Sequence, residues 1–163
     1  MRRVNFTFVD RLVLTPVELV AAIKPTIILF GILFILNTIG IGKFELTDLV
    51  AILGAVAIGS ILTPVLLPFI PFRAFSLKGF VLGIIWVLVL MIMTPLSLLK
   101  LLAYFYLLPT ISAYLSLQFT GCSTYTSPSG VNKEMRLALP LMLAFAVIGC
   151  ILIILDMLGV KIL

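Results

Sequence analysis

The residues best suited to chemistry lie in one polar run of the sequence, from Thr120 to Arg136. This run is rich in hydroxyl side chains, contains Cys122 and ends in basic residues. Hydroxyls at a helix N-terminus beside a basic side chain can bind an anion, and a thiolate is a soft ligand that suits mercury or another soft cation. The simpler alternative is a connecting loop, in which Gly121 ends one helix and Ser127 or Ser129 caps the next.

Catalytic and multi-ligand metal sites are harder to find. The sequence has no histidine, which excludes a Ser/His/Asp triad, and its two cysteines cannot form a usual zinc site. A lone thiol gives one ligand, so Cys122 is only a candidate metal ligand, and Cys150 falls in an apolar segment where a thiol is inert. We therefore expect no catalysis and no bound cofactor from this chain alone. The carboxylates lie at predicted helix ends, where they cap helices or balance charge: Asp10, Glu18, Glu45, Asp48 and Glu134.

The composition of the chain indicates the kind of fold that holds these residues. Of 163 residues, 63% are hydrophobic and 10% are charged, with a mean hydropathy of +1.37. A soluble domain usually has about 25% charged residues. The composition predicts an all-α integral membrane protein. The net charge of +5 does not indicate nucleic-acid binding, because the basic residues are scattered at predicted helix ends.

A hydrocarbon core about 30 Å thick needs about 20 helical residues. Five segments qualify or nearly do, so the sequence predicts a bundle of about five transmembrane helices in residues 25–163, with spans at 25–41, 49–70, 79–99, 101–120 and 137–155. Pro95 lies in the third span and Pro109 is expected to break the fourth. Only the stretch from Pro95 to Lys100 separates these two spans, which predicts a tight helical hairpin.

Residues 1–24 are predicted to form a cytoplasmic and interfacial segment. Thr15 can cap a helix that begins at Pro16, and Glu18 completes a capping box. We expect a short interfacial helix that runs into the first span with a bend at Pro25; the alternative is a frayed tail.

The basic residues also predict the orientation in the membrane. Eight lie on the side of the N-terminus and three on the other side, which places the N-terminus in the cytoplasm and the C-terminus outside. The first group is Arg2, Arg3, Arg11, Lys24, Arg73, Lys78, Lys133 and Arg136, and the second is Lys43, Lys100 and Lys161. The predicted location is the cell (inner, or cytoplasmic) membrane.

Prolines and small residues predict two structural features. Pro64, Pro68 and Pro71 cannot all continue a regular helix, so we expect a helix break there and an irregular stretch at 68–76 that other spans shield. A helix that simply ends early is the alternative. Small residues at four-residue spacing predict close helix packing: Ala51, Ala55 and Gly59 in the second span, and Gly79 and Gly83 in the third.

Three segments together resemble the C-terminal membrane domain of the mercury-methylating corrinoid protein family, HgcA. They are DRLVLTPVEL at 10–19, PFIPFRAFSLKG at 68–79, and FTGCSTYTSPSGV at 119–131 with KEM at 133–135. The resemblance covers essentially the whole chain in order, and the third segment is the most specific. In that family a soluble corrinoid-binding domain, with a cap helix of pattern Asn-Val-Trp-Cys-Ala-Ala-Gly-Lys, precedes five transmembrane helices. This sequence lacks that pattern, and its single tryptophan is Trp86.

The resemblance implies a membrane anchor and docking module of a corrinoid-dependent methyl-transfer system, without the corrinoid-binding domain itself. The implied partners are the lipid bilayer, a cytoplasmic corrinoid protein that carries the cobalamin, and a ferredoxin-like reductant. The predicted docking residues are Thr120, Gly121, Ser123, Thr124, Tyr125, Thr126, Ser127, Ser129, Lys133 and Arg136. The alternative is a small transporter or permease-like protein for a metal or small solute. A lipid-modifying enzyme is a third option for which we find no catalytic residues.

Overall fold

The structure is a computed structural model, and its described part is entirely helical apart from turns and short connections. Its helices are α2 (Leu46–Ala57), a π-helical turn (Ile58–Leu62), α3 (Thr63–Leu66), α4 (Phe75–Met93), α5 (Leu98–Gln118) and α6 (Pro128–Met157). The described residues are 16, 19–20, 22–24, 26–28, 30–31, 34–35, 37–40, 45–66, 69–70, 72, 74–118 and 128–158.

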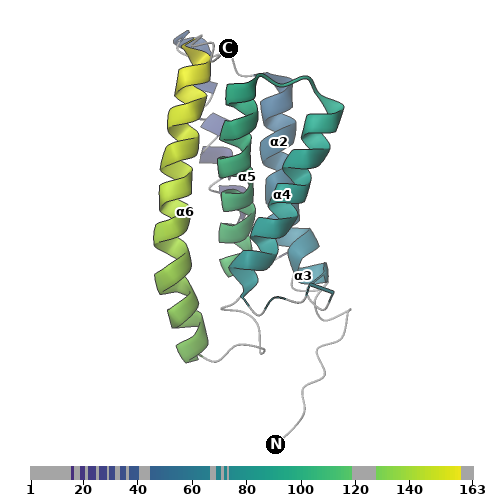
Figure 1. Ribbon diagram of the computed structural model, residues 1–163, viewed down its shortest axis with the longest axis vertical. Coiled ribbons are helices and arrows are strands. Elements are labelled where there is room, and N and C mark those ends of the chain that lie inside the picture. The colour runs from purple at the N-terminus through teal and green to yellow at the C-terminus, as the bar shows by residue number, and fades with distance from the viewer. Residues whose placement is uncertain are drawn as a thin grey trace, which may run out of the picture.

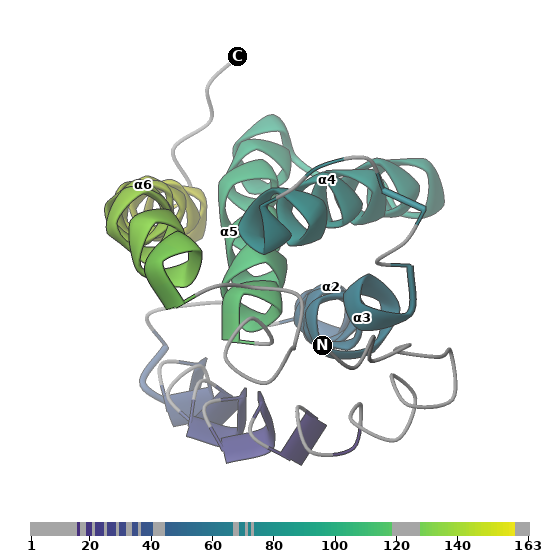
Figure 2. The same cartoon turned by 90° about the horizontal axis from the view of Figure 1, so that it is seen from below.

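Within that described part, four helices are long and apolar enough to cross a membrane: Leu46–Leu66, Phe75–Met93, Leu98–Gln118 and Asn132–Asp156. They stand side by side (Figure 1), and α5 lies between α6 on one side and α2 and α4 on the other (Figure 2). The described part of the chain thus confirms an all-helical fold with helices that are long and apolar enough to span a membrane. The first expected span, 25–41, is described only in pieces. Its described residues up to Thr38 are helical, and its full length stays a prediction.

The predicted hairpin of the third and fourth spans is present as α4 and α5, but the third span ends earlier than expected. Thr94 is extended (φ −136°, ψ 134°), because the residue before a proline is disfavoured in the helical region. Pro95 therefore lies in the connection and not inside a span. The expected break at Pro109 is wrong, since α5 runs without interruption from Leu98 to Gln118.

Pro64 does not break its helix either. It is fully buried, and the helical run continues through it to Leu66. The π-helical turn comes just before it, where Thr63 donates both its backbone N–H and its hydroxyl (2.9 Å) to the carbonyl of Ile58. Such local widening is one way in which membrane helices accommodate a proline that offers no N–H.

The stretch after Leu66 is non-helical at the residues that are described, namely 69–70, 72 and 74. Pro68 and Pro71 lie outside the described residues. The expected shielding by other spans is wrong at Phe69 and Phe72, because neighbouring helices leave 79% and 45% of these residues exposed.

Close packing through small residues is confirmed. A Cβ on Gly83 would lie 2.5 Å from the Cα of Pro109, and one on Gly79 would lie 2.6 Å from the carbonyl oxygen of Ser112. Only glycine allows α4 to approach the backbone of α5 this closely. Gly59 meets α5 in the same way, with the Ser112 carbonyl 2.8 Å from its would-be Cβ.

The indole of one residue of α4, Trp86, fills the space between α4 and α2. The indole of Trp86 lies against Gly54 and donates from Nε1 to the carbonyl of Ala51 at 3.0 Å. Ala51 and Ala55 are fully buried in the core of α2, α4 and α5. Ala22 is also fully buried, against α2 and α5. The boundary predicted between residues 24 and 25 therefore does not separate Ala22 from the bundle.

Candidate functional site

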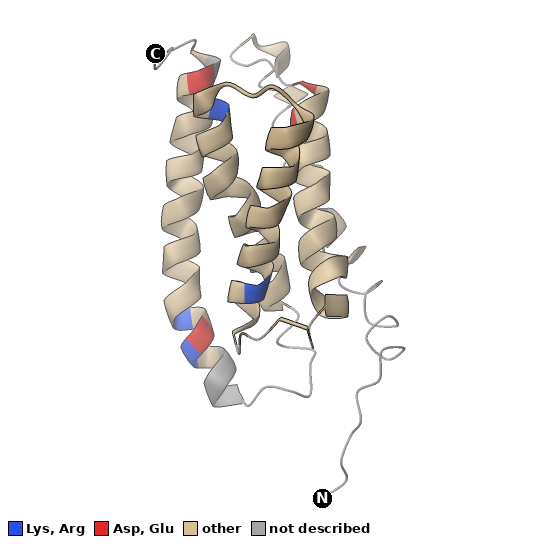
Figure 3. Cartoon of the chain, turned by 45° about the vertical axis from the view of Figure 1, so that its right-hand side comes forward, with Lys and Arg blue, Asp and Glu red and all other residues tan. Residues whose placement is uncertain are grey.

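The charged residues described between Glu45 and Asp156 lie near the two ends of the helices (Figure 3). Lys78 lies in the first turn of α4, and Lys133 and Arg136 lie in the first turns of α6. We call this the basic end of the bundle. Glu45, Lys100 and other charged side chains lie at the opposite end, where α2 and α5 begin. A membrane interior excludes charge, so this separation is compatible with helices that span a membrane.

At the basic end, one carboxylate joins two helices. Ser76 is the second residue of α4, and its backbone N–H is one of the first four in a helix, which have no intrahelical acceptor. Glu134, on α6, accepts through Oε1 from that N–H at 2.8 Å and from the Ser76 hydroxyl at 2.7 Å. A carboxylate at this position also interacts favourably with the helix dipole. Glu134 therefore caps α4 from another helix and fixes α6 against it.

The same end holds a buried cation. Lys78 is only 6% exposed, and its Nζ lies 5.7 Å from the centre of the Phe75 ring. That distance is within the range of a cation–π interaction. Lys133 and Arg136 are both exposed, and they lie one residue before and two residues after Glu134. The basic end thus combines a helix–helix contact, a buried lysine and two exposed cations.

At the opposite end, Lys100 of α5 pairs with both carboxylates at the start of α2. Its Nζ lies 2.9 Å from Glu45 Oε2 and 3.1 Å from Asp48 Oδ1. The hydroxyl of Tyr104 donates a hydrogen bond to Asp48 as well. Glu45 and Asp48 form a capping box at the start of α2, as their assignment to helix ends implies. The shared pairing with Lys100 was not predicted. Lys100 and Tyr104 are four residues apart on α5, and that spacing is the local signal for a shared partner.

A second polar contact at this end joins the α4–α5 connection to α6. The hydroxyl of Ser97 donates to Asp156 Oδ1 at 2.6 Å. Three helices are therefore held together by polar contacts where the sequence alone indicated only charged helix ends.

Most of the predicted docking residues lie outside the described part of the chain. These are Thr120, Gly121, Ser123, Thr124, Tyr125, Thr126 and Ser127, and the candidate metal ligand Cys122 is among them too. Ser129 lies in the first turn of α6, two turns at most from the exposed Lys133 and Arg136. Cys150 lies in α6 and is exposed on its surface. No group of three or more potential metal ligands is present among the described residues.

Comparison with known proteins adds no identification. The chain matches no protein-family model, no curated protein and no solved structure.

Proposed function

We propose that the chain is a five-span protein of the cytoplasmic membrane that anchors and docks a cytoplasmic corrinoid protein in a methyl-transfer system related to mercury methylation. The contact between Ser76 and Glu134 carries this proposal. These residues belong to the second and third segments that resemble the HgcA family. They are 58 positions apart in the sequence, and they meet at the basic end.

The basic residues support the proposal that the docking face is on the cytoplasmic side. Lys78, Lys133 and Arg136 lie at one end of the bundle, together with the end of α5 that leads into the polar run. Cytoplasmic connections are enriched in lysine and arginine. The proposed docking face is therefore the cytoplasmic face, formed by the polar run 120–136, which includes the start of α6.

Exposed cations on this face suit a partner with an acidic surface. Lys133 and Arg136 project from a helix whose position Glu134 fixes, so they would be presented in a defined arrangement. Complementary rim charges mainly raise the association rate and select the partner. In this proposal cobalamin stays on the partner, a ferredoxin-like protein supplies electrons to it, and the membrane chain does no chemistry itself.

The test is binding of a cobalamin-loaded corrinoid domain of the resembling family to vesicles that contain the chain. Sedimentation followed by cobalamin absorbance should show binding to these vesicles and none to empty ones. Replacing Lys133 and Arg136 together with glutamine should weaken binding several-fold, since exposed charge pairs contribute about 0.2–1 kcal/mol each. Lys161→Gln, the same change on the predicted outer side, is the matched control and should leave binding unchanged.

A second variant tests the polar run itself. Replacing Thr124, Tyr125 and Thr126 with alanine should weaken binding, while Cys122→Ser should leave partner binding intact and remove any mercury binding by the isolated chain. Equal binding by wild type and the triple variant would place the docking face elsewhere. Binding no stronger than to empty vesicles would refute the proposal, and solute flux into vesicles that contain this chain alone would favour a transporter.

A further inference from the structure

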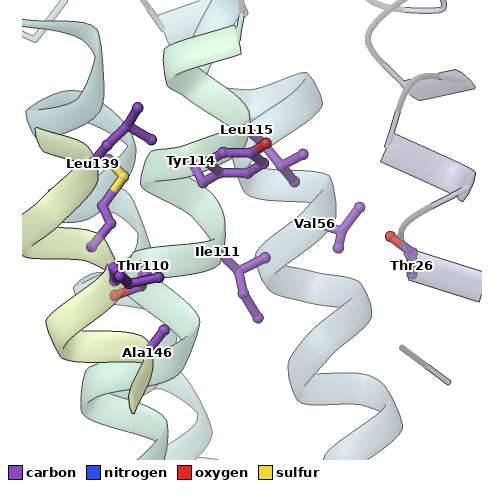
Figure 4. A pocket seen from close by; sticks show the side chains of 10 residues that line it. Thr26, Val56, Thr110, Ile111, Tyr114, Leu115, Leu139 and Ala146 are labelled. Atoms are coloured by element: carbon purple, nitrogen blue, oxygen red, sulfur yellow. The ribbon is translucent and has the colours of Figure 1, made fainter. Parts of the chain in front are cut away.

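A cavity of about 330 Å³ opens between α5, α6 and the N-terminal part of the chain. Figure 4 shows side chains that line it: Tyr114 and Leu115 of α5 lie between Leu139 of α6 and Val56 of α2, and Thr26 lies beyond Val56. We call this cavity the lateral groove. Its volume is at the lower end of the roughly 300–1,000 Å³ that is usual for small-molecule pockets.

The lining of the lateral groove is almost wholly apolar. Its two threonine hydroxyls donate to backbone carbonyls of their own helical turns: Thr110 to Tyr106 at 2.7 Å, and Thr26 to Ala22 at 2.6 Å. The remaining walls are aliphatic side chains, the thioether side chain of Met142 and Tyr114. A polar solute would lose its hydration there without gaining equivalent hydrogen bonds, whereas a hydrocarbon chain would lose nothing.

One cation is aligned with the groove. Leu139, Leu143 and Ala146 line it and are spaced by four and three residues, so they share one face of α6. Arg136 precedes Leu139 by three residues and lies on the same face, about 4.5 Å further along the helix axis toward the basic end. Arg136 is exposed, and no ion pair involving it is present among the described residues.

We propose that the lateral groove binds one acyl chain of an anionic phospholipid of the bilayer, with the lipid phosphate paired to Arg136. The guanidinium fork matches a phosphate geometrically, and the groove continues from it into the hydrophobic part of α6. The stretch from Leu139 to Ala146 is about 10 Å long, which accommodates the upper part of an acyl chain. This inference does not depend on a corrinoid partner.

The first experiment titrates the delipidated protein in detergent with phosphatidylglycerol or phosphatidylcholine of identical chains, and counts bound lipids by native mass spectrometry. We expect one tightly held lipid and a preference of about fivefold for phosphatidylglycerol, as one basic residue near a lipid headgroup provides. Arg136→Gln should abolish the preference, and Arg136→Lys should retain most of it. An unchanged preference in Arg136→Gln would overturn the headgroup assignment.

The second experiment fills the groove. Ala146→Trp should abolish binding of both lipids. Leu141→Trp is the matched control, because Leu141 is 57% exposed and lies on the opposite face of α6; this variant should bind as wild type does. Equal lipid binding by the two tryptophan variants would overturn the proposal.

A third measurement uses the unmodified chain, so it does not depend on whether a variant folds. Phosphatidylglycerol with a photoreactive diazirine in the middle of one acyl chain should label peptides from residues 110–115 and 139–146. Labelling spread evenly over the exposed faces of α4 and α6 would show ordinary annular lipid and would also overturn the proposal.

Discussion

Replacing Gly83 with alanine tests how closely α4 and α5 approach each other. The new Cβ would lie 2.5 Å from the Cα and 3.1 Å from the nitrogen of Pro109, whereas ordinary contact begins near 3.4 Å. These are backbone atoms in the middle of α5, so no side-chain rotation can relieve the clash. The helices must separate by about 1 Å, a gap that forfeits a quarter to a half of each dispersion contact it affects. Overpacking of this kind costs about 1–3 kcal/mol.

The matched control is Gly31→Ala, because a Cβ at Gly31 meets nothing within 4 Å. Both glycines are helical, so both substitutions gain the same helix propensity, about 1 kcal/mol. That gain cancels in the comparison, and Gly83→Ala should be about 1–3 kcal/mol less stable than Gly31→Ala. Unfolding by sodium dodecyl sulfate in mixed micelles, followed by the fluorescence of Trp86, measures this difference. Equal stabilities of the two variants would refute the reasoning from backbone approach.

Two further predictions concern the far end of the bundle and the topology. Lys100→Met should destabilise the protein by about 1–3 kcal/mol in the same unfolding assay, because it removes a charged hydrogen-bond donor from Glu45 and Asp48; wild-type stability would mean that these contacts contribute nothing. In a background without native cysteines, thiol reagents should label Asn5→Cys from the cytoplasmic side and Val160→Cys from the outer side. Labelling of both from one side would rule out five spans.

Composition and length were enough to predict an all-helical chain and the approximate place of four helices that are long and apolar enough to span a membrane. Rules that consider only the local sequence failed at two prolines, where the structure keeps the helix intact. Pro64 and Pro109 were expected to break helices on the basis of their missing N–H groups. In the structure a π-helical turn precedes Pro64, and Gly83 of α4 lies directly against the backbone of Pro109. Neither feature is visible in the sequence around the proline.

The polar contacts at the two ends of the bundle could not be predicted either, and the reason is different. Glu134 was recognised as a residue near a helix end, but its partner Ser76 lies 58 positions away. Lys100 likewise meets Asp48 across 52 positions. Helix periodicity identifies which residues share a face of one helix, but it does not determine which helix that face will meet. The resemblance to a known family did place Ser76 and Glu134 in its second and third segments, without predicting that they touch.

The packing at the centre of the bundle bears on the alternative of a transporter. Gly59 of the π-helical turn and Gly79 of α4 both lie against the backbone of α5 at Ser112. A passage between α2, α4 and α5 would require all of these backbone contacts to open. The ends of the same helices are joined by Lys100 to α2 and by Glu134 between α4 and α6. A rigid bundle with its cations presented at one face is what docking requires, whereas alternating access requires helices that can separate. If the chain is the proposed anchor, these contacts stay closed in the working protein, and vesicles that contain the chain alone carry no solute.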